Sequence, residues 1–193
     1  MTENPSETKI LMAEALKKLI KDRPFTKITV QDIVNECNIN RNTFYYHFES
    51  NVDLHYFTYE MEVKKVGDSY KKANASIPQA MDFVLDYIDE NIPLCQCAYE
   101  SLGEQQFRTI LEKDLFLLAN ETIGYFGEQN SVDFTEDFRT FVSFSFANLL
   151  NTQIIWYVKH TGELDKEKFR EYFQTFFTAA LKSVMEEGLK KGF

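Results

Sequence analysis

Residues 29–48, TVQDIVNECNINRNTFYYHF, decide the fold of this chain. Thr29 is a favoured N-cap residue and Asp32 follows three positions later, which is the spacing of a capping box at the start of a helix. Asn40 can cap a second helix. The turn between the two helices is short and contains Asn38, a residue type that tolerates φ > 0. The stretch therefore predicts a helix-turn-helix.

The second predicted helix has an apolar side and a polar side. A rotation of 100° per residue places Phe44 and Phe48 inward. The rest of its surface carries Arg41, Asn42, Thr43, Tyr45, Tyr46 and His47. Helix stability does not require these side chains on one short outer surface. Contact with the base edges and phosphates of DNA does use such groups.

From the turn onward, the sequence resembles the DNA-binding motif of the tetracycline-repressor (TetR) family. That family's usual pattern is G-V-S-x-G-T-(F/L)-Y-x-(H/Y)-F-x-S-K-(E/D)-x-L, and residues 38–54 here read NINRNTFYYHFESNVDL. The positions that agree in register are Thr43, Phe44, Tyr45, His47, Phe48, Ser50 and Leu54. The motif is recognisable over residues 8–55, whereas the rest of the chain matches by helical pattern alone.

The chain departs from the family pattern at three positions. Asn38 stands in place of the turn glycine, and Asn42 in place of a small residue. Asn51 replaces the usual lysine, which removes a phosphate contact that the resemblance would imply. Either the affinity for DNA is lower or another cation compensates.

The resemblance implies an all-α transcriptional regulator that is a ligand-responsive homodimeric repressor. Two recognition helices would enter successive major grooves of a palindromic DNA operator, about 34–36 Å apart. We expect Arg41 to contact a guanine edge, Asn42 an adenine edge, and Tyr45 either a phosphate or a thymine methyl group. The residues expected mainly at the DNA backbone are Thr29, Thr43, Tyr46 and His47. Gln31 could contact either bases or backbone.

Charge is distributed unevenly between the two parts of the chain. The 193 residues carry 21 Lys and Arg against 30 Asp and Glu, a net charge of −9. Residues 1–50 contain 7 of each, and their net charge is 0, so the acidic excess lies in residues 51–193. Phosphate contacts drive salt-dependent affinity, so we expect modest non-specific DNA binding, with specificity coming from base contacts.

Helical periodicity continues through the chain. We expect residues 1–50 to form a three-helix DNA-binding domain, residues 51–69 a connecting helix, and residues 70–193 a helical ligand-binding and dimerisation domain. An inward stripe of the first helix comprises Leu11, Ala15, Leu16, Leu19 and Ile20. Further helices are predicted from Pro78, from Glu104 to Phe126, from Thr135 to His160 and from Asp165. Pro93 either kinks the first of these or starts another.

The final helix has the clearest apolar face, made of Phe169, Phe173, Phe176, Phe177, Ala180, Leu181 and Val184. Residues 140–158 carry no charge, and 7 of these 19 are polar, which favours burial between protein surfaces over a membrane span. The resemblance implies that the two segments form a four-helix dimer interface. The alternative is that residues 140–158 form an ordinary core helix within one chain.

The second half is rich in aromatic residues, which could line a pocket for a small hydrophobic or aromatic effector or could simply pack the core. The candidates are Phe83, Tyr87, Tyr99, Phe107, Tyr125, Phe126, Phe144 and Trp156. A related possibility is a co-regulator of the same fold that works through a partner protein instead of a small molecule.

Other functional classes have little support in the sequence. The chain contains no phosphate-binding glycine loop, no H-E-x-x-H and no G-x-S-x-G, so we expect no enzyme activity and no cofactor. Cys95 and Cys97 lie two positions apart, and side chains at that spacing diverge on a helix, so we expect packing and no metal site. A thiol sensor would require an exposed cysteine with a lowered pKa. Few cysteines and no signal segment indicate the cytoplasm.

Overall fold

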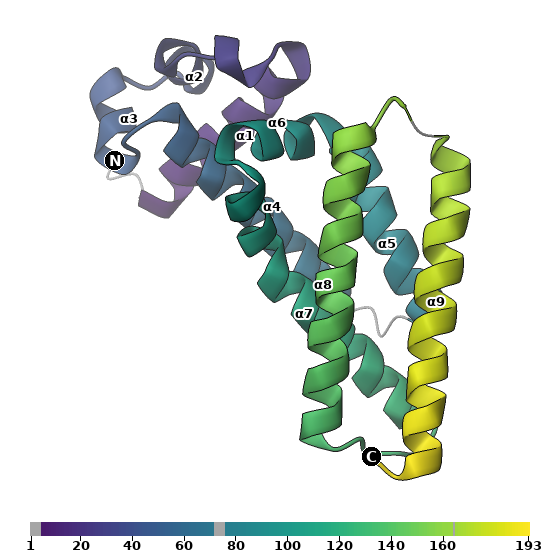
Figure 1. Cartoon of the computed structure of the whole chain (residues 1–193). Helices are drawn as coiled ribbons and strands as arrows, with labels where there is room; N and C mark the ends of the chain where they lie inside the picture. Colours follow the sequence, from purple (N-terminus) through teal and green to yellow (C-terminus); the bar gives the residue numbers. More distant parts are fainter. Residues whose placement is uncertain (1–4, 72–75, 164) are drawn as a thin grey trace. The chain divides into compact units, whose positions relative to one another are not determined.

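The computed structural model describes residues 5–71, 76–163 and 165–193, which fold into α-helices without a strand (Figure 1). This confirms the all-α prediction. The elements are α1 (Pro5–Asp22), the 3-10 helix η1 (Phe25–Lys27), α2 (Val30–Cys37), α3 (Arg41–His47), α4 (Asn51–Lys71), α5 (Ile77–Glu90), α6 (Ile92–Leu102), α7 (Glu104–Gln129), α8 (Glu136–His160) and α9 (Lys166–Lys191).

Proline 93 starts a new helix. It lies in the first turn of α6, where its missing N–H costs nothing, and α5 has already ended at Glu90. Of the two alternatives at Pro93, a kinked helix or a new one, the structure shows the new helix. The expected domain junction near residue 70 adjoins residues 72–75, which lie outside the described part of the chain.

The helices pack into two compact units. The first comprises Met1–Glu62 and Asn91–Phe107, and the second comprises Val63–Glu90 and Arg108–Phe193. In the first unit, α1 packs against both α2 and α6. Its core contains the fully buried side chains of Met12, Leu16, Ile33, Phe44 and Leu54.

One prediction for the first helix is wrong. Ala15, Leu16, Leu19 and Ile20 are buried as expected, but Leu11 is 44% exposed. Leu11 lies at the edge of the apolar stripe, and its backbone carbonyl accepts a weak hydrogen bond from the thiol of Cys37. Its backbone therefore contributes to packing while its side chain faces outward.

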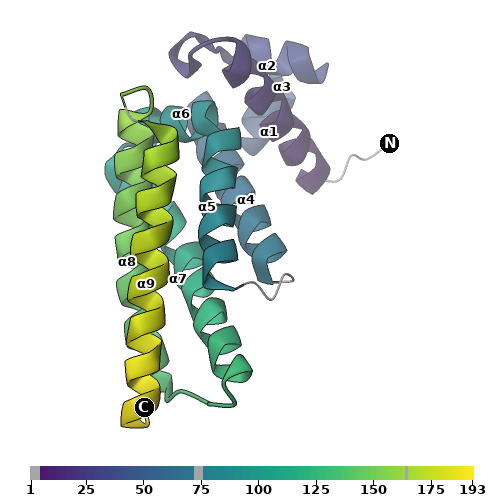
Figure 2. The ribbon, with the colours of Figure 1, turned by 90° about the vertical axis from the view of Figure 1, so that its right-hand side faces the viewer.

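In the second unit, α5 and α9 run beside each other (Figure 2). Four buried residues at a spacing of four form the inner stripe of α9: Phe173, Phe177, Leu181 and Met185. Phe176 and Val184, which the sequence places on the same broad face, are 54% and 38% exposed. The apolar face of α9 is therefore divided between an inner stripe and an exposed one.

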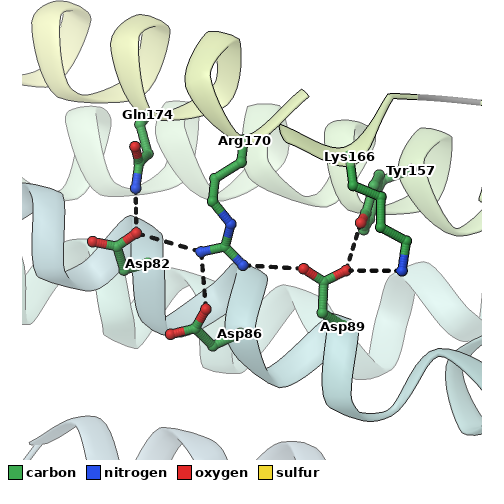
Figure 3. Close-up of polar contacts among 7 residues, drawn as sticks. All are labelled: Asp82, Asp86, Asp89, Tyr157, Lys166, Arg170 and Gln174. Atoms are coloured by element: carbon green, nitrogen blue, oxygen red, sulfur yellow. Dashed lines mark hydrogen bonds and ion pairs between the residues drawn. The ribbon is translucent and has the colours of Figure 1, made fainter. Parts of the chain in front are cut away.

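A polar cluster joins α5 to α9 (Figure 3). The Arg170 guanidinium lies 3.4 Å from a carboxylate oxygen of Asp82, 2.9 Å from one of Asp86 and 3.0 Å from one of Asp89. Gln174 also donates to Asp82, and Tyr157 of α8 donates its hydroxyl to Asp89. Burial, reinforced by the bond to Asp89, raises the pKa of Tyr157. One arginine thus holds three carboxylates that would otherwise repel one another.

Candidate DNA-binding surface

Both helices of the helix-turn-helix are capped as the sequence predicts. The Thr29 hydroxyl accepts from the backbone N–H of Asp32, and the Asp32 carboxylate accepts from the backbone N–H of Thr29 at 2.8 Å. At α3, the side-chain oxygen of Asn40 accepts from the backbone N–H of Thr43 at 2.8 Å. Asn38 has φ 53°, in the left-handed region, and its N–H bonds back to the end of α2. These local bonds fix where α3 begins relative to α2.

The recognition helix presents its polar side to solvent. Phe44 is fully buried and Phe48 nearly so, which confirms the predicted inner side. Arg41, Asn42, Tyr45 and Tyr46 are exposed, and Thr43 and His47 are half-buried. The six side chains predicted to contact DNA on α3 therefore share one short helix anchored by two phenylalanines.

Arg41 and Tyr45 form a pair on the exposed surface. An Arg41 Nη donates to the Tyr45 hydroxyl at 3.2 Å, and the guanidinium carbon lies 5.5 Å from the centre of the tyrosine ring. Residues four apart on a helix are neighbours, so the pair is formed without any tertiary contact. The ring restricts the arginine while leaving most of its donors available to a ligand.

The residues predicted at the start of α2 already have bonds within the chain. The Thr29 hydroxyl donates to the Asp32 carboxylate at 2.6 Å, so its only proton is occupied. Bonds from Thr29, aided by the nearby Arg23 guanidinium, lower the pKa of Asp32. Gln31 is exposed and donates to the Asn35 side chain at 2.8 Å, which adds Asn35 to the polar surface. In the sequence, only its spacing of four residues from Gln31 indicates that Asn35 lies on the same side of α2.

Asn51 takes part in a contact within the first unit. Its amide nitrogen donates to the backbone carbonyl of Ile28 at 2.8 Å. The bond ties the first turn of α4 to the segment that leads into α2. The side chain that replaces the family's lysine is therefore engaged inside the protein.

The sequence pattern does not indicate that His55 is buried, because its partners lie far away along the chain. His55 of α4 is fully buried, and its Nδ1 lies 2.7 Å from the Ser101 hydroxyl of α6. Ser101 donates its proton to the backbone carbonyl of Cys97, so Nδ1 must be the donor to Ser101. His55 Nε2 has no hydrogen-bond partner among the described residues. Burial lowers the pKa of His55 to about 4.

The eight aromatic candidates for an effector pocket are divided between the two units. Tyr99 and Phe107 contact each other edge to face in the core of the first unit, where Phe107 also stacks on Tyr59. Tyr125 lines a hollow of about 270 Å³ in the second unit. Phe126 stacks on Phe134. Sequence periodicity places an aromatic side chain on one face of a helix, but it does not identify the residues or ligand that this face contacts.

The remaining aromatic candidates lie at different depths in the second unit. Phe83 and Tyr87 on α5 are half-buried. Phe144 is 55% exposed and Trp156 41% exposed, both on α8. Trp156 lines an open groove of about 450 Å³ between α8 and α9. Phe144 and Trp156 therefore belong to an outer surface.

The three cysteines are buried. Burial raises the pKa of Cys37 to about 11 and those of Cys95 and Cys97 to about 12. Thiolate formation is therefore disfavoured at neutral pH, which does not favour a thiol sensor. None of the described helices is both long and apolar enough to cross a membrane.

Two capped helices, a tight turn and an exposed polar recognition helix define a helix-turn-helix DNA-binding protein. Residues 13–54 match the family "Bacterial regulatory proteins, tetR family". The DNA-binding segment of the chain is therefore that of a tetR-family transcriptional regulator.

Solved structures share the fold over nearly the whole chain. One is "Dihydroxyacetone kinase operon activator DhaS", with 19% identity, a TM-score of 0.67, and coverage of 91% of this chain and 96% of that one. Another is a tetR-family transcriptional regulator from Streptomyces coelicolor, with 13% identity, a TM-score of 0.65, and coverage of 95% and 89%. A search of curated proteins finds no significant match.

Proposed function

We propose that the chain acts as a homodimer on a palindromic operator, with α3 of each subunit in the major groove. The observation that carries this is the exposed polar surface of α3, whose start is fixed by the Asn40 cap and whose inner side is anchored by Phe44. Functionally, we assign residues 1–50 to DNA binding, 51–69 to connection and 70–193 to regulation and dimerisation. The operator half-sites would lie about 34–36 Å apart.

The exposed apolar surface of α8 and α9 supports dimerisation through these helices. Seven of the thirteen large exposed apolar side chains in the described part of the chain belong to them: Phe141, Phe144, Leu149, Trp156, Tyr172, Phe176 and Val184. On each helix these residues fall on one side. The opposite side of α8 is buried within the chain, so α8 serves as a core helix and leaves a second apolar side for a partner. Contiguous exposed apolar surface is typical of protein interfaces.

Contacts with DNA are assigned by side-chain chemistry and exposure. Arg41 reads a guanine edge and Asn42 an adenine edge, because both are exposed in the first turn of α3. Tyr45, held against Arg41, contacts a phosphate or a thymine methyl group. Thr43, Tyr46 and His47 contact the backbone, and Gln31 contacts either bases or backbone. Thr29 can bind a phosphate only by exchanging its bond to Asp32.

Effector binding belongs to the second unit in this proposal. The half-buried rings of Phe83, Tyr87, Tyr125 and Phe126 are the aromatic candidates that remain inside it. A small hydrophobic or aromatic effector would act by binding one DNA-binding state better than the other. Release of the chain from DNA by such a compound would identify a repressor.

A second candidate is a co-regulator that responds to a partner protein. It is favoured by the exposed apolar surface of α8 and α9. In that case a partner protein would occupy surface left free by the dimer. Co-purification of a stoichiometric partner, together with no response to small compounds, would favour this alternative.

The proposal is tested by selecting bound sequences from a pool of random DNA duplexes. We expect an inverted repeat with half-sites one helical turn apart, and sedimentation of the complex as two subunits per duplex. Selection of a single asymmetric half-site by one subunit would contradict the dimeric mode of binding. Failure to enrich any sequence would contradict specific recognition by α3.

A further inference from the structure

The first unit has few cations available for DNA. It contains seven Lys and Arg residues, namely Lys9, Lys17, Lys18, Lys21, Arg23, Lys27 and Arg41. Three of them are neutralised by carboxylates: Lys17 pairs with Glu14 and Glu62, Lys18 with Glu36, and Arg23 with Asp32.

Of the other four cations, Lys9 lies over the rings of Phe48 and Phe57. Lys21, Lys27 and Arg41 make no ion pair with any residue that the structure describes. Arg41 is already assigned to base reading, so the unit depends on very few other cations for phosphate binding.

Lys27 has an exposed side chain on a fixed backbone. It is the last residue of η1, and its N–H bonds to the Pro24 carbonyl at 2.9 Å. The next residue, Ile28, is only 2% exposed, and Thr29 after it caps α2. The backbone on both sides of the lysine is therefore held by a turn, a buried side chain and a helix cap.

Asn51 brings the start of α4 to this same turn. Its amide donates to the carbonyl of Ile28, the residue that follows Lys27. Lys27 and position 51 therefore flank one peptide segment, although they are 24 residues apart in sequence. The TetR pattern has a lysine at position 51, whereas here a lysine directly precedes Ile28, the residue that Asn51 contacts.

We propose that Lys27 contacts an operator phosphate and supplies the cation that position 51 lacks. This inference rests on the proposed docking of α3 in the major groove. In that geometry the first helix of the motif crosses the DNA backbone, so phosphates pass near the start of α2. The ion pair between Asp32 and Arg23 leaves neither charge available to attract a phosphate at this helix start. The exposed Lys27, two residues before the Thr29 cap, places there a cation that is unpaired among the described residues.

The test is the salt dependence of binding to a random-sequence DNA duplex long enough to span two major grooves. Lys27→Gln should reduce the slope of log K against log salt by about 0.9 for each bound subunit, and weaken binding on all sequences alike. Lys27→Arg should keep the slope of the native chain. Lys113→Gln, which removes the same charge from an exposed position on α7, should leave the slope unchanged.

A double variant tests the link to position 51. Lys27→Gln combined with Asn51→Lys should recover the slope, because a cation returns to the same turn. Recovery would support a shared phosphate, and a slope equal to that of Lys27→Gln alone would overturn this part of the proposal. Circular dichroism of each variant confirms that the fold is kept.

The outcomes separate this inference from the proposed function. If the native chain binds the duplex and Lys27→Gln has the same slope, Lys27 does not contact phosphate while the DNA-binding mode stands. Equal losses in Lys27→Gln and Lys113→Gln would show a general charge effect and would also overturn the inference. If the native chain binds neither this duplex nor any sequence selected from the random pool, both the docking mode and the role of Lys27 are wrong.

Discussion

Arg41 is the residue on which base recognition depends most. Its guanidinium is restrained by Tyr45 but keeps free donors, as bidentate contact with a guanine requires. Arg41→Ala should therefore weaken operator binding by about 1–3 kcal/mol and relax the preference at one base pair. Binding titrations with single-base operator variants measure both effects.

Arg41→Lys provides the matched control, because it keeps the charge but loses the planar fork of donors. It should retain the salt slope while relaxing the same base preference. Unchanged operator specificity in both variants would remove Arg41 from base reading and leave Asn42 as the principal reader.

His55 gives a pH dependence whose direction follows from its burial. Its pKa in the folded chain, about 4, lies below the ordinary value of 6.5, so the unfolded chain takes up the proton first as pH falls. The free energy of unfolding should therefore decrease from pH 6.5 toward pH 4 and level off below that. Between neutral pH and pH 5 the loss should be about 2 kcal/mol.

His55→Gln keeps an amide donor for Ser101 but cannot be protonated in this range. Urea unfolding of both proteins at the two pH values should show a smaller acid loss in the variant, with the other titrating groups cancelling in the comparison. An equal loss in the variant and the native chain would mean that His55 does not control this transition.

At the scale of helices, the sequence predicts what depends on neighbouring residues. The caps at Thr29 and Asn40 and the left-handed Asn38 follow from local chemistry, and the structure confirms them. At Pro93 the sequence leaves open whether a helix is kinked or started, and the structure shows that one starts. The bond from Asn51 to Ile28 spans 23 residues, and the bond from Arg170 to Asp89 spans 81. No local pattern specifies such partners, because they depend on how the helices pack.

The dependence on helix packing also explains why the sequence does not predict which aromatic residues of the second unit are buried. Phe173 and Phe176 lie on one apolar face in the sequence, yet the first packs inward and the second is 54% exposed. A hydrophobic pattern identifies surface that avoids water. Whether a helix of the same chain, a ligand or a second subunit covers that surface is decided at a larger scale.

Arg170 should stabilise the contact between α5 and α9. Replacing it with Met leaves three aspartates without their main counter-charge. The free energy of unfolding should therefore fall by about 1–2 kcal/mol, because the partial exposure of the cluster weakens these ion pairs. Lys182→Met on the same helix, whose pair with Glu186 is exposed, should cost less than about 0.5 kcal/mol. Chemical denaturation compares the two variants, and similar small losses would show that the cluster adds little stability.

For the whole molecule, the exposed side of α8 and α9 makes a prediction about assembly. Phe144 and Phe176 are each more than half exposed, so replacing both with Glu should leave the fold of one chain intact while placing charge in the proposed interface. We expect the native chain to sediment as a dimer at micromolar concentration and the double variant as a monomer. Since a monomer offers only one recognition helix, its affinity for the full operator should fall steeply, whereas its affinity for an isolated half-site should not change.

Val52→Glu is the matched control, because Val52 is 41% exposed in the first unit and lies outside α8 and α9. It should sediment as a dimer, which would show that the effect of the double variant depends on where the charge is placed. A double variant that remains dimeric would move the subunit interface away from α8 and α9. The exposed phenylalanines would then be available to a partner protein, which is the condition that the co-regulator alternative requires.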